Sequence, residues 1–136
     1  MFAYQLEPQL AVDEFIDLLI RSTLAERRPI HDQATLAGML SHASIILTAR
    51  FENRLVGVSR AITDFHYCTY LSDLAVDQSF QRQGIGKELI RLTRSKLGAR
   101  CTLILLSAPA AVEYYPHVRF EHHPQAWVLR PDSPFP

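Results

Sequence analysis

The chain has 136 residues, 48% of them hydrophobic and 21% charged, which is typical of one soluble globular domain that can bury its own core. Its 14 basic side chains balance its 14 acidic ones, so the net charge excludes strong electrostatic attraction to nucleic acid or to an anionic membrane. Cys68 and Cys101 have neither CxxC spacing nor companion ligands, and they predict reduced thiols rather than a zinc site.

The first part of the chain alternates between extended and helical patterns. A short strand is expected over residues 2–6, and an apolar stripe with helical spacing then runs from Val12 to Ile20. Pro29 prevents this helix from continuing, and Asp32 can cap a second one. The sequence therefore predicts one strand and two helices before residue 44.

From Ser44 onward the residue types become typical of strands. Residues 45–51 and 55–63 flank a plausible tight turn at 52–54, which predicts a β-hairpin. A third strand of this group is expected over residues 67–76. Three neighbouring strands in this order favour an antiparallel arrangement.

Further elements are expected in the last third of the chain. An amphipathic helix follows Gly86, and the apolar run 101–106 predicts a strand that is buried on both faces. Pro109 can open a short helix, residues 126–129 offer a last strand, and the proline-rich segment 131–136 is expected to be a loose tail.

These elements follow one another in the order β-α-α-β-β-β-α-β-α-β. The sequence therefore predicts a single α/β domain over residues 1–136, with a mixed sheet and helices on both faces. No apolar stretch reaches membrane-spanning length, and the N-terminus lacks the pattern of a secretory signal. We therefore expect a cytoplasmic protein with neither a membrane nor a nucleic acid as partner.

Residues 81–88 form a glycine-rich segment at the start of the central helix. Backbone N–H groups at such a position lie at the positive end of the helix dipole and suit a phosphate group. A P-loop would need glycine in place of Gln81 and serine or threonine in place of Glu88. A dinucleotide-binding loop would need glycine in place of Leu89. The sequence therefore matches neither of these motifs.

The pattern Q/R-x-x-G-x-G/A, in contrast, is complete in Gln81, Gly84 and Gly86. With residues 74–76 before it and 114–120 after it, the chain resembles the GNAT superfamily of acyl-CoA-dependent N-acetyltransferases. The resemblance covers most of the chain and implies a sheet of six or seven mostly antiparallel strands, splayed at its centre. It also implies acetyl-CoA as acyl donor, no metal, and a primary amine of a small molecule or peptide as acceptor.

The resemblance assigns binding roles to two backbone segments. The N–H groups of residues 83–87 would bind the pyrophosphate of coenzyme A, and Arg82 would add positive charge. Residues 74–76 would bind the pantetheine arm across a gap from Ser107 and Ala108, while their side chains pack in the core. The expected cofactor-binding residues are Leu74, Ala75, Val76, Gln81, Arg82, Gln83, Gly84, Ile85, Gly86, Lys87 and Ser107.

Two residues are candidates for catalysis. Tyr115 matches the family tyrosine beside the coenzyme sulfur, where a phenol could protonate the departing thiolate; the alternative is an aromatic packing residue like Tyr114. Asp73 could accept the proton of the amine, or it could instead order a neighbouring turn or attract a cationic substrate. Weaker candidates for the acceptor pocket are Asp64, His66, His31 and Asp32.

The closing segment departs from the family pattern at Arg119, where glycine is usual, so we expect the loop 116–120 to differ in shape. Two other functions stay open: a non-catalytic acyl-CoA-binding sensor or interaction module, and an enzyme with a longer acyl group or a hydroxyl acceptor. Apolar residues near the chain ends would permit a homodimer.

Overall fold

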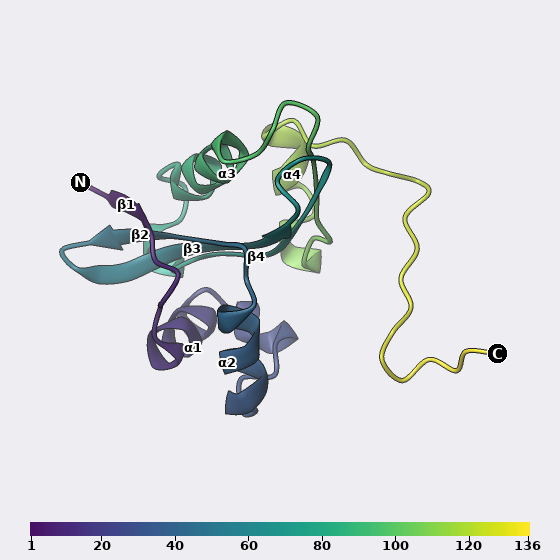
Figure 1. Cartoon of the computed structure of the whole chain (residues 1–136). Coiled ribbons are helices and arrows are strands. Elements are labelled where there is room, and N and C mark those ends of the chain that lie inside the picture. Colours follow the sequence, from purple (N-terminus) through teal and green to yellow (C-terminus); the bar gives the residue numbers. More distant parts are fainter.

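One mixed sheet organises the computed structural model, which describes residues 1–136. Its strand order is β1-β2-β3-β4-β5, with β1 to β4 antiparallel and β5 parallel to β4 (Figure 1). This confirms the expected α/β fold with a mostly antiparallel sheet, although the sheet has five strands rather than six or seven. The strands are Ala3–Leu6, Ile45–Phe51, Arg54–Thr63, Cys68–Val76 and Thr102–Ile104.

Helices cover both faces of this sheet, as the sequence predicts (Figure 1). One face carries α1 (Val12–Arg21) and α2 (Gln33–Ser41), and the other carries α3 (Ile85–Ser95), with α4 (Tyr114–His117) beyond its end. Short 3₁₀ helices lie at Leu24–Arg27 (η1), Gln78–Phe80 (η2) and Pro109–Ala111 (η3).

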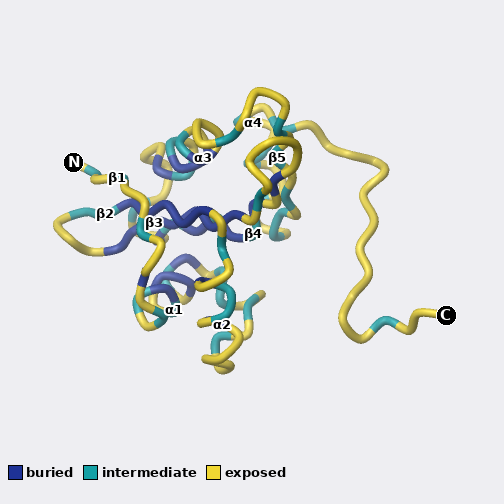
Figure 2. Tube along the Cα trace, viewed as in Figure 1, coloured by how far each residue is buried: buried dark blue, intermediate teal, exposed yellow.

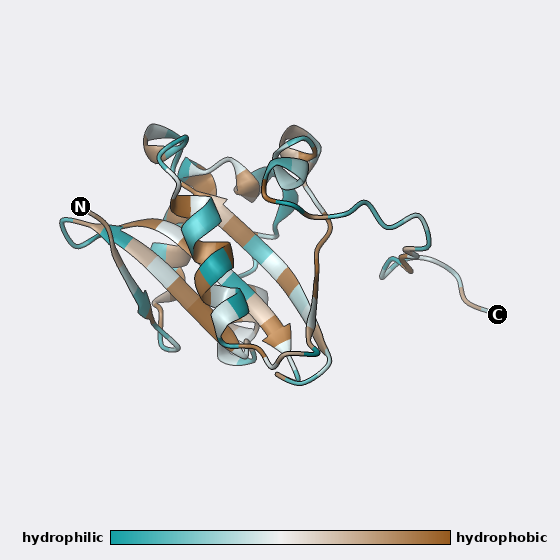
Figure 3. Ribbon diagram, turned by 90° about the horizontal axis from the view of Figure 1, so that it is seen from above, coloured by the Kyte–Doolittle hydropathy of each residue, from teal (hydrophilic) through white to brown (hydrophobic).

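Apolar side chains form one buried layer on each side of the sheet, and the strands between them are the most deeply buried part of the chain (Figure 2). The first layer joins α1 and α2 to the sheet, with Phe15 and Leu19 of α1 fully buried. The second lies between α3 and the sheet. Ile85 and Leu89 of α3 pack toward the sheet, while the outer positions of this helix are hydrophilic (Figure 3). No helix is both long and apolar enough to cross a membrane.

The predicted cap of the second helix is confirmed. Asp32 is the N-cap of α2, and its carboxylate accepts a hydrogen bond from the Thr35 backbone N–H at 3.0 Å. A second carboxylate, that of Asp77, caps η2 by accepting from the Ser79 N–H at 2.8 Å. Both contacts satisfy N–H groups that a helix start leaves without partners.

The C-terminal part differs from the sequence prediction. Residues 126–129 form no strand, and the chain beyond α4 runs away from the sheet as an exposed segment (Figures 1 and 2). β5 is therefore an edge strand rather than one buried on both faces. In the apolar run that contains it, Leu103 and Leu105 pack against the core, whereas Ile104 is 52% exposed. An uninterrupted apolar run does not reveal this alternation.

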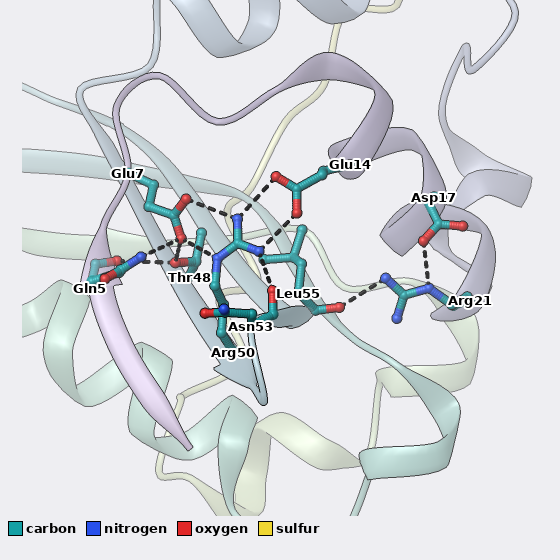
Figure 4. Close-up of polar contacts among 9 residues, drawn as sticks. All are labelled: Gln5, Glu7, Glu14, Asp17, Arg21, Thr48, Arg50, Asn53 and Leu55. Carbon is teal, nitrogen blue, oxygen red and sulfur yellow. Dashed lines mark hydrogen bonds and ion pairs between the residues drawn. The ribbon is translucent and has the colours of Figure 1, made fainter. Parts of the chain in front are cut away.

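An ion-pair network joins β1, α1 and β2 (Figure 4). The Arg50 guanidinium donates to both carboxylate oxygens of Glu7, at 2.8 and 2.9 Å, and to those of Glu14, at 2.8 and 3.0 Å. The Thr48 hydroxyl donates to Glu7 as well. Hydrogen bonds from Arg50, above all, lower the pKa of Glu7 to about 2. The network therefore holds β1 and α1 against the sheet.

This pKa predicts a specific dependence of stability on acid. Because the pKa of Glu7 is depressed on folding, its contribution is fully present above its usual value of 4.5 and is lost as the pH falls toward 2. We expect Glu7→Gln to lower the free energy of unfolding at pH 7 by about 1–2 kcal/mol and to weaken the loss of stability between pH 4.5 and 2. Urea unfolding across this range measures both effects. The matched variant Glu121→Gln, in the exposed C-terminal segment, should show the same pH dependence of stability as the wild type. If the free energy of unfolding changed with pH in the same way in both variants, the acid-dependent stability could not be assigned to Glu7.

Candidate active site

A gap opens between β4 and the edge strand β5. The two strands pair only from Cys68 opposite Thr102 to Tyr70 opposite Ile104, and β4 then continues to Val76 paired with β3 but no longer with β5. This is the splay that the family resemblance implies. A cavity of about 210 Å³ lies in the gap, and we call it the β4–β5 cavity. It is smaller than a typical ligand pocket, so it has room for the reacting end of a ligand but not for a whole coenzyme.

The β4 backbone presents free polar groups to this gap. Asp77 N–H donates to Val56 O at 2.9 Å, so Asp77 and every second residue before it direct their N–H and C=O groups toward β3. The residues between them direct these groups away from β3. Leu74 and Val76 are those residues, and Leu74 also lines the cavity. The Gln81 side chain donates to Val76 O at 3.2 Å, a contact that the motif alone did not reveal.

The segment 82–87, which we call the amide loop, carries a run of unpaired donors. None of its six backbone N–H groups donates a hydrogen bond to another group of the protein. Gly84 is the N-cap of α3 with φ +83°, and Arg82 has φ +65°, so both lie in the left-handed region. Consecutive N–H groups at a helix start, together with the helix dipole, form a cradle suited to phosphate oxygens.

Gly86 has a second function that the sequence did not predict. A Cβ atom at this position would lie 2.9 Å from the Tyr114 hydroxyl oxygen and 3.8 Å from a methyl group of Val76. The absence of a side chain therefore lets α4 pack directly on the start of α3. This packing fixes the position of Tyr115, the next residue of α4, relative to the amide loop.

Tyr115 lines the β4–β5 cavity and packs edge-on against both Tyr114 and Phe120, with ring centroids 5.3 and 5.4 Å apart. Its hydroxyl makes no hydrogen bond within the protein, yet it is not among the fully buried polar atoms, so it keeps access to the surroundings. Burial, and to a smaller extent Tyr114, raises the pKa of its phenol to about 12. The phenol is therefore protonated at neutral pH and free to donate.

Asp73 occupies a position that does not suit a general base. Its side chain is 0% exposed, one oxygen accepts from Arg28 Nε at 2.6 Å, and the other accepts from Arg60 Nε. An oxygen committed to a buried ion pair is not free to take a proton from an amine. These contacts favour the alternative, in which this carboxylate orders its neighbours, and the role of Asp73 as a base stays a prediction.

The remaining predicted residues lie outside the cavity or at its edge. Asp64 accepts hydrogen bonds from three backbone N–H groups of the turn after β3, which lower its pKa to about 2. Ser107 does not line the cavity, although its neighbours Leu106 and Ala108 do. The weaker candidates are likewise absent from the lining: Asp64, His66, His31 and Asp32.

The lining charges of the cavity are all basic, and sequence reasoning missed them. Arg27 and Arg28, from the end of η1, reach the cavity together with Arg130, and no acidic residue lines it. In the sequence Arg27 and Arg28 stand in a predicted loop, within the segment 21–42 expected to wall the acceptor pocket, and Arg130 lies between the predicted last strand and the tail; none of the three was singled out. Only the folded chain brings them together.

Arg119 occupies the position in the closing segment where the family usually has glycine. It adopts φ +70°, the left-handed conformation that the usual glycine would permit, and its N–H donates to Pro116 O at 3.0 Å. The backbone turn therefore forms with arginine in the left-handed conformation that glycine would favour, at a cost of about 1–2 kcal/mol. The structure holds no cluster of three or more histidine, cysteine or acidic side chains that could bind a metal.

The chain is similar to known proteins in sequence and in fold. Residues 12–120 match the Acetyltransferase (GNAT) family. The chain is 37% identical over 76 residues to histone acetyltransferase TAP1 of Glycine max, an alignment that covers 54% of this chain and 33% of that protein. The aligned part thus spans about a third of the length of the curated relatives it matches.

Two solved structures show the same fold. One is a probable acetyltransferase from meticillin-resistant Staphylococcus aureus, with a TM-score of 0.76 at 18% identity, covering 96% of this chain and 98% of that one. The other is a GNAT family acetyltransferase from Streptococcus pneumoniae TIGR4, with a TM-score of 0.69 at 23% identity and coverages of 96% and 99%. At these identities the likeness concerns the fold alone. Because the family match extends over residues 12–120, most of the chain, this protein belongs to the GNAT family of acetyltransferases.

Proposed function

We propose that this protein transfers the acetyl group of acetyl-CoA to the primary amine of a small molecule by direct attack. The GNAT family uses acetyl-CoA as its donor. The observation that carries the proposal for this chain is the amide loop, whose unpaired N–H groups lie at the start of α3, next to the splayed strands and Tyr115.

Each part of the site has a distinct role in this proposal. The N–H groups of residues 83–87 bind the pyrophosphate, and the side chains of Arg82 and Lys87 add positive charge. The backbone groups of Leu74 and the N–H of Val76, which point away from β3, bind the pantetheine arm as a strand would, while Val76 O accepts from Gln81. The thioester then enters the β4–β5 cavity beside Tyr115.

The reaction requires a neutral amine. Its nitrogen attacks the acetyl carbonyl carbon, the C–N bond forms, and the C–S bond breaks with its electron pair on sulfur. The nitrogen loses one proton and the thiolate gains one, so the products are the N-acetylated amine and coenzyme A thiol. In this proposal a backbone N–H of β4 donates to the carbonyl oxygen as its negative charge develops.

Tyr115 supplies the proton to sulfur. A thiol has an ordinary pKa of about 8.5, well below the value of about 12 that burial gives this phenol. The phenol therefore stabilises the developing thiolate through a hydrogen bond, and proton transfer completes when the proton released by the nitrogen restores the phenol. Asp73 takes no part in this step; water accepts the proton of the amine and passes it on to the phenoxide.

Calorimetry and a thiol-release assay test the proposal together. We expect coenzyme A to bind the purified protein, and we expect acetyl-CoA to release thiol only when a suitable amine is added. Coenzyme binding without amine-dependent thiol release across a broad amine panel would favour the alternative, a non-catalytic acyl-CoA-binding module. Failure of coenzyme A to bind would overturn both functions.

A further inference from the structure

The end of the β4–β5 cavity that faces η1 carries an excess of positive charge. Among the lining residues are three arginines and no carboxylate. The nearest buried acid, Asp73, is shared between Arg28 and Arg60, so it neutralises one of these two cations and leaves the other uncompensated. A cationic substrate would meet repulsion here, which argues against the alternative in which Asp73 attracts such a substrate.

Arg28 is held rigidly and still has donors to offer. Its Nε donates to Asp73, one terminal nitrogen donates to Arg27 O at 2.8 Å, and the other donates to Ser72 O at 2.7 Å. A guanidinium has five N–H groups, so two remain. Its side chain is 21% exposed and lines the cavity. Arginine fixed in this way is suited to bind a planar carboxylate.

Arg27 is the complementary partner. It lies in η1 next to Arg28, is exposed, and takes part in no ion pair or side-chain hydrogen bond. Its guanidinium is therefore free to approach a ligand without breaking any contact of the folded chain. Together the two arginines form a positive pair of one fixed and one adjustable side chain at the cavity.

We propose that the acceptor of this enzyme carries a carboxylate close to its amine, as in a free amino acid, and that Arg27 and Arg28 bind this carboxylate. The inference rests on the proposed function and names the class of its acceptor. Carboxylate binding brings the amine toward the thioester next to Tyr115.

Matched acceptors test this assignment. We compare kcat/KM for β-alanine with that for ethylamine, and for L-phenylalanine with those for its amide and for phenethylamine. A charge-assisted arginine–carboxylate contact predicts at least a roughly 10-fold preference for the compound that carries the carboxylate. Equal rates, or a preference for the amines without a carboxylate, would overturn the inference while leaving the acetyltransferase function intact.

Variants then locate the contact. Arg27→Gln should raise the KM for the amino acid about 10-fold, and leave unchanged both the coenzyme A affinity and the rate with the amine that lacks the carboxylate. Arg28→Lys, which keeps a cation beside Asp73, should weaken the same preference. The matched control is Arg100→Gln, an exposed arginine at the opposite end of β5, which should behave as wild type. Equal losses with all amines in Arg27→Gln would contradict a role in carboxylate binding.

Discussion

Tyr115→Phe should lower kcat about 100-fold or more and change the affinity for coenzyme A by no more than about twofold. General acid catalysis contributes a factor of this size, and the substitution removes only the hydroxyl group, which has no partner within the protein. The aromatic ring and its edge-on packing with Tyr114 and Phe120 remain. Steady-state kinetics with acetyl-CoA, together with calorimetry of coenzyme A, separate the two quantities.

The pH profile adds a readout that packing would not change. Because burial raises the pKa of Tyr115 to about 12, the phenol keeps its proton throughout the range in which the amine is deprotonated. The kcat of the wild type should therefore rise with pH and show no decline up to pH 10. Tyr114→Phe is the matched control, since its hydroxyl lies over Gly86, and kcat should stay near the wild-type value. Equal losses of turnover and affinity in Tyr115→Phe would assign Tyr115 to packing.

The parts of the site that depend on backbone conformation could be predicted from the sequence. The motif Gln81-x-x-Gly84-x-Gly86 requires a chain that turns through the left-handed region before a helix, and Gly84 with φ +83° does so at the start of α3. The strand before it was equally predictable, because its residues are typical of strands and the amide loop must follow it. Such features are local, so a short stretch of sequence specifies them.

The electrostatic parts of the site could not be predicted, because they join distant segments. Asp73 is 45 positions from Arg28 and 13 from Arg60, and nothing in the sequence around any of the three indicates the pairing. A carboxylate on the correct strand therefore suggested a base, whereas the fold buries it between two cations. The same separation concealed the basic lining of the cavity.

The prediction of a last strand at the edge of the sheet was wrong for a different reason. Strand propensity in residues 126–129 is a local preference, and a strand forms only where a neighbouring strand can pair with it. In this structure the segment is exposed and unpaired, and β5 is left as the edge. The positive φ of Arg119 is a related case, because its backbone hydrogen bonds around the turn after α4 outweigh the preference of arginine for other conformations.

Gly84→Val should abolish measurable coenzyme A binding while the chain stays folded. A Cβ at Gly84 would have no protein atom within 4 Å, so the substitution creates no clash inside the folded chain. Its effect on stability comes from the left-handed φ alone and should be about 1–2 kcal/mol. A ligand held by the amide loop would meet the new side chain directly, because the pyrophosphate must approach the backbone closely.

Two companion variants separate backbone strain from obstruction of the ligand. Gly84→Asn tolerates the left-handed conformation and should fold with near wild-type stability, yet it should still weaken coenzyme A binding by at least about 10-fold because a side chain is present. Gly38→Val makes the same change as Gly84→Val at a glycine of α2 that also has open space around it, and it should bind coenzyme A normally. Calorimetry measures the affinity and thermal unfolding measures the stability. If Gly84→Val bound coenzyme A as tightly as Gly38→Val does, the amide loop could not be the pyrophosphate site, and the proposed acetyl transfer would lose the observation that carries it.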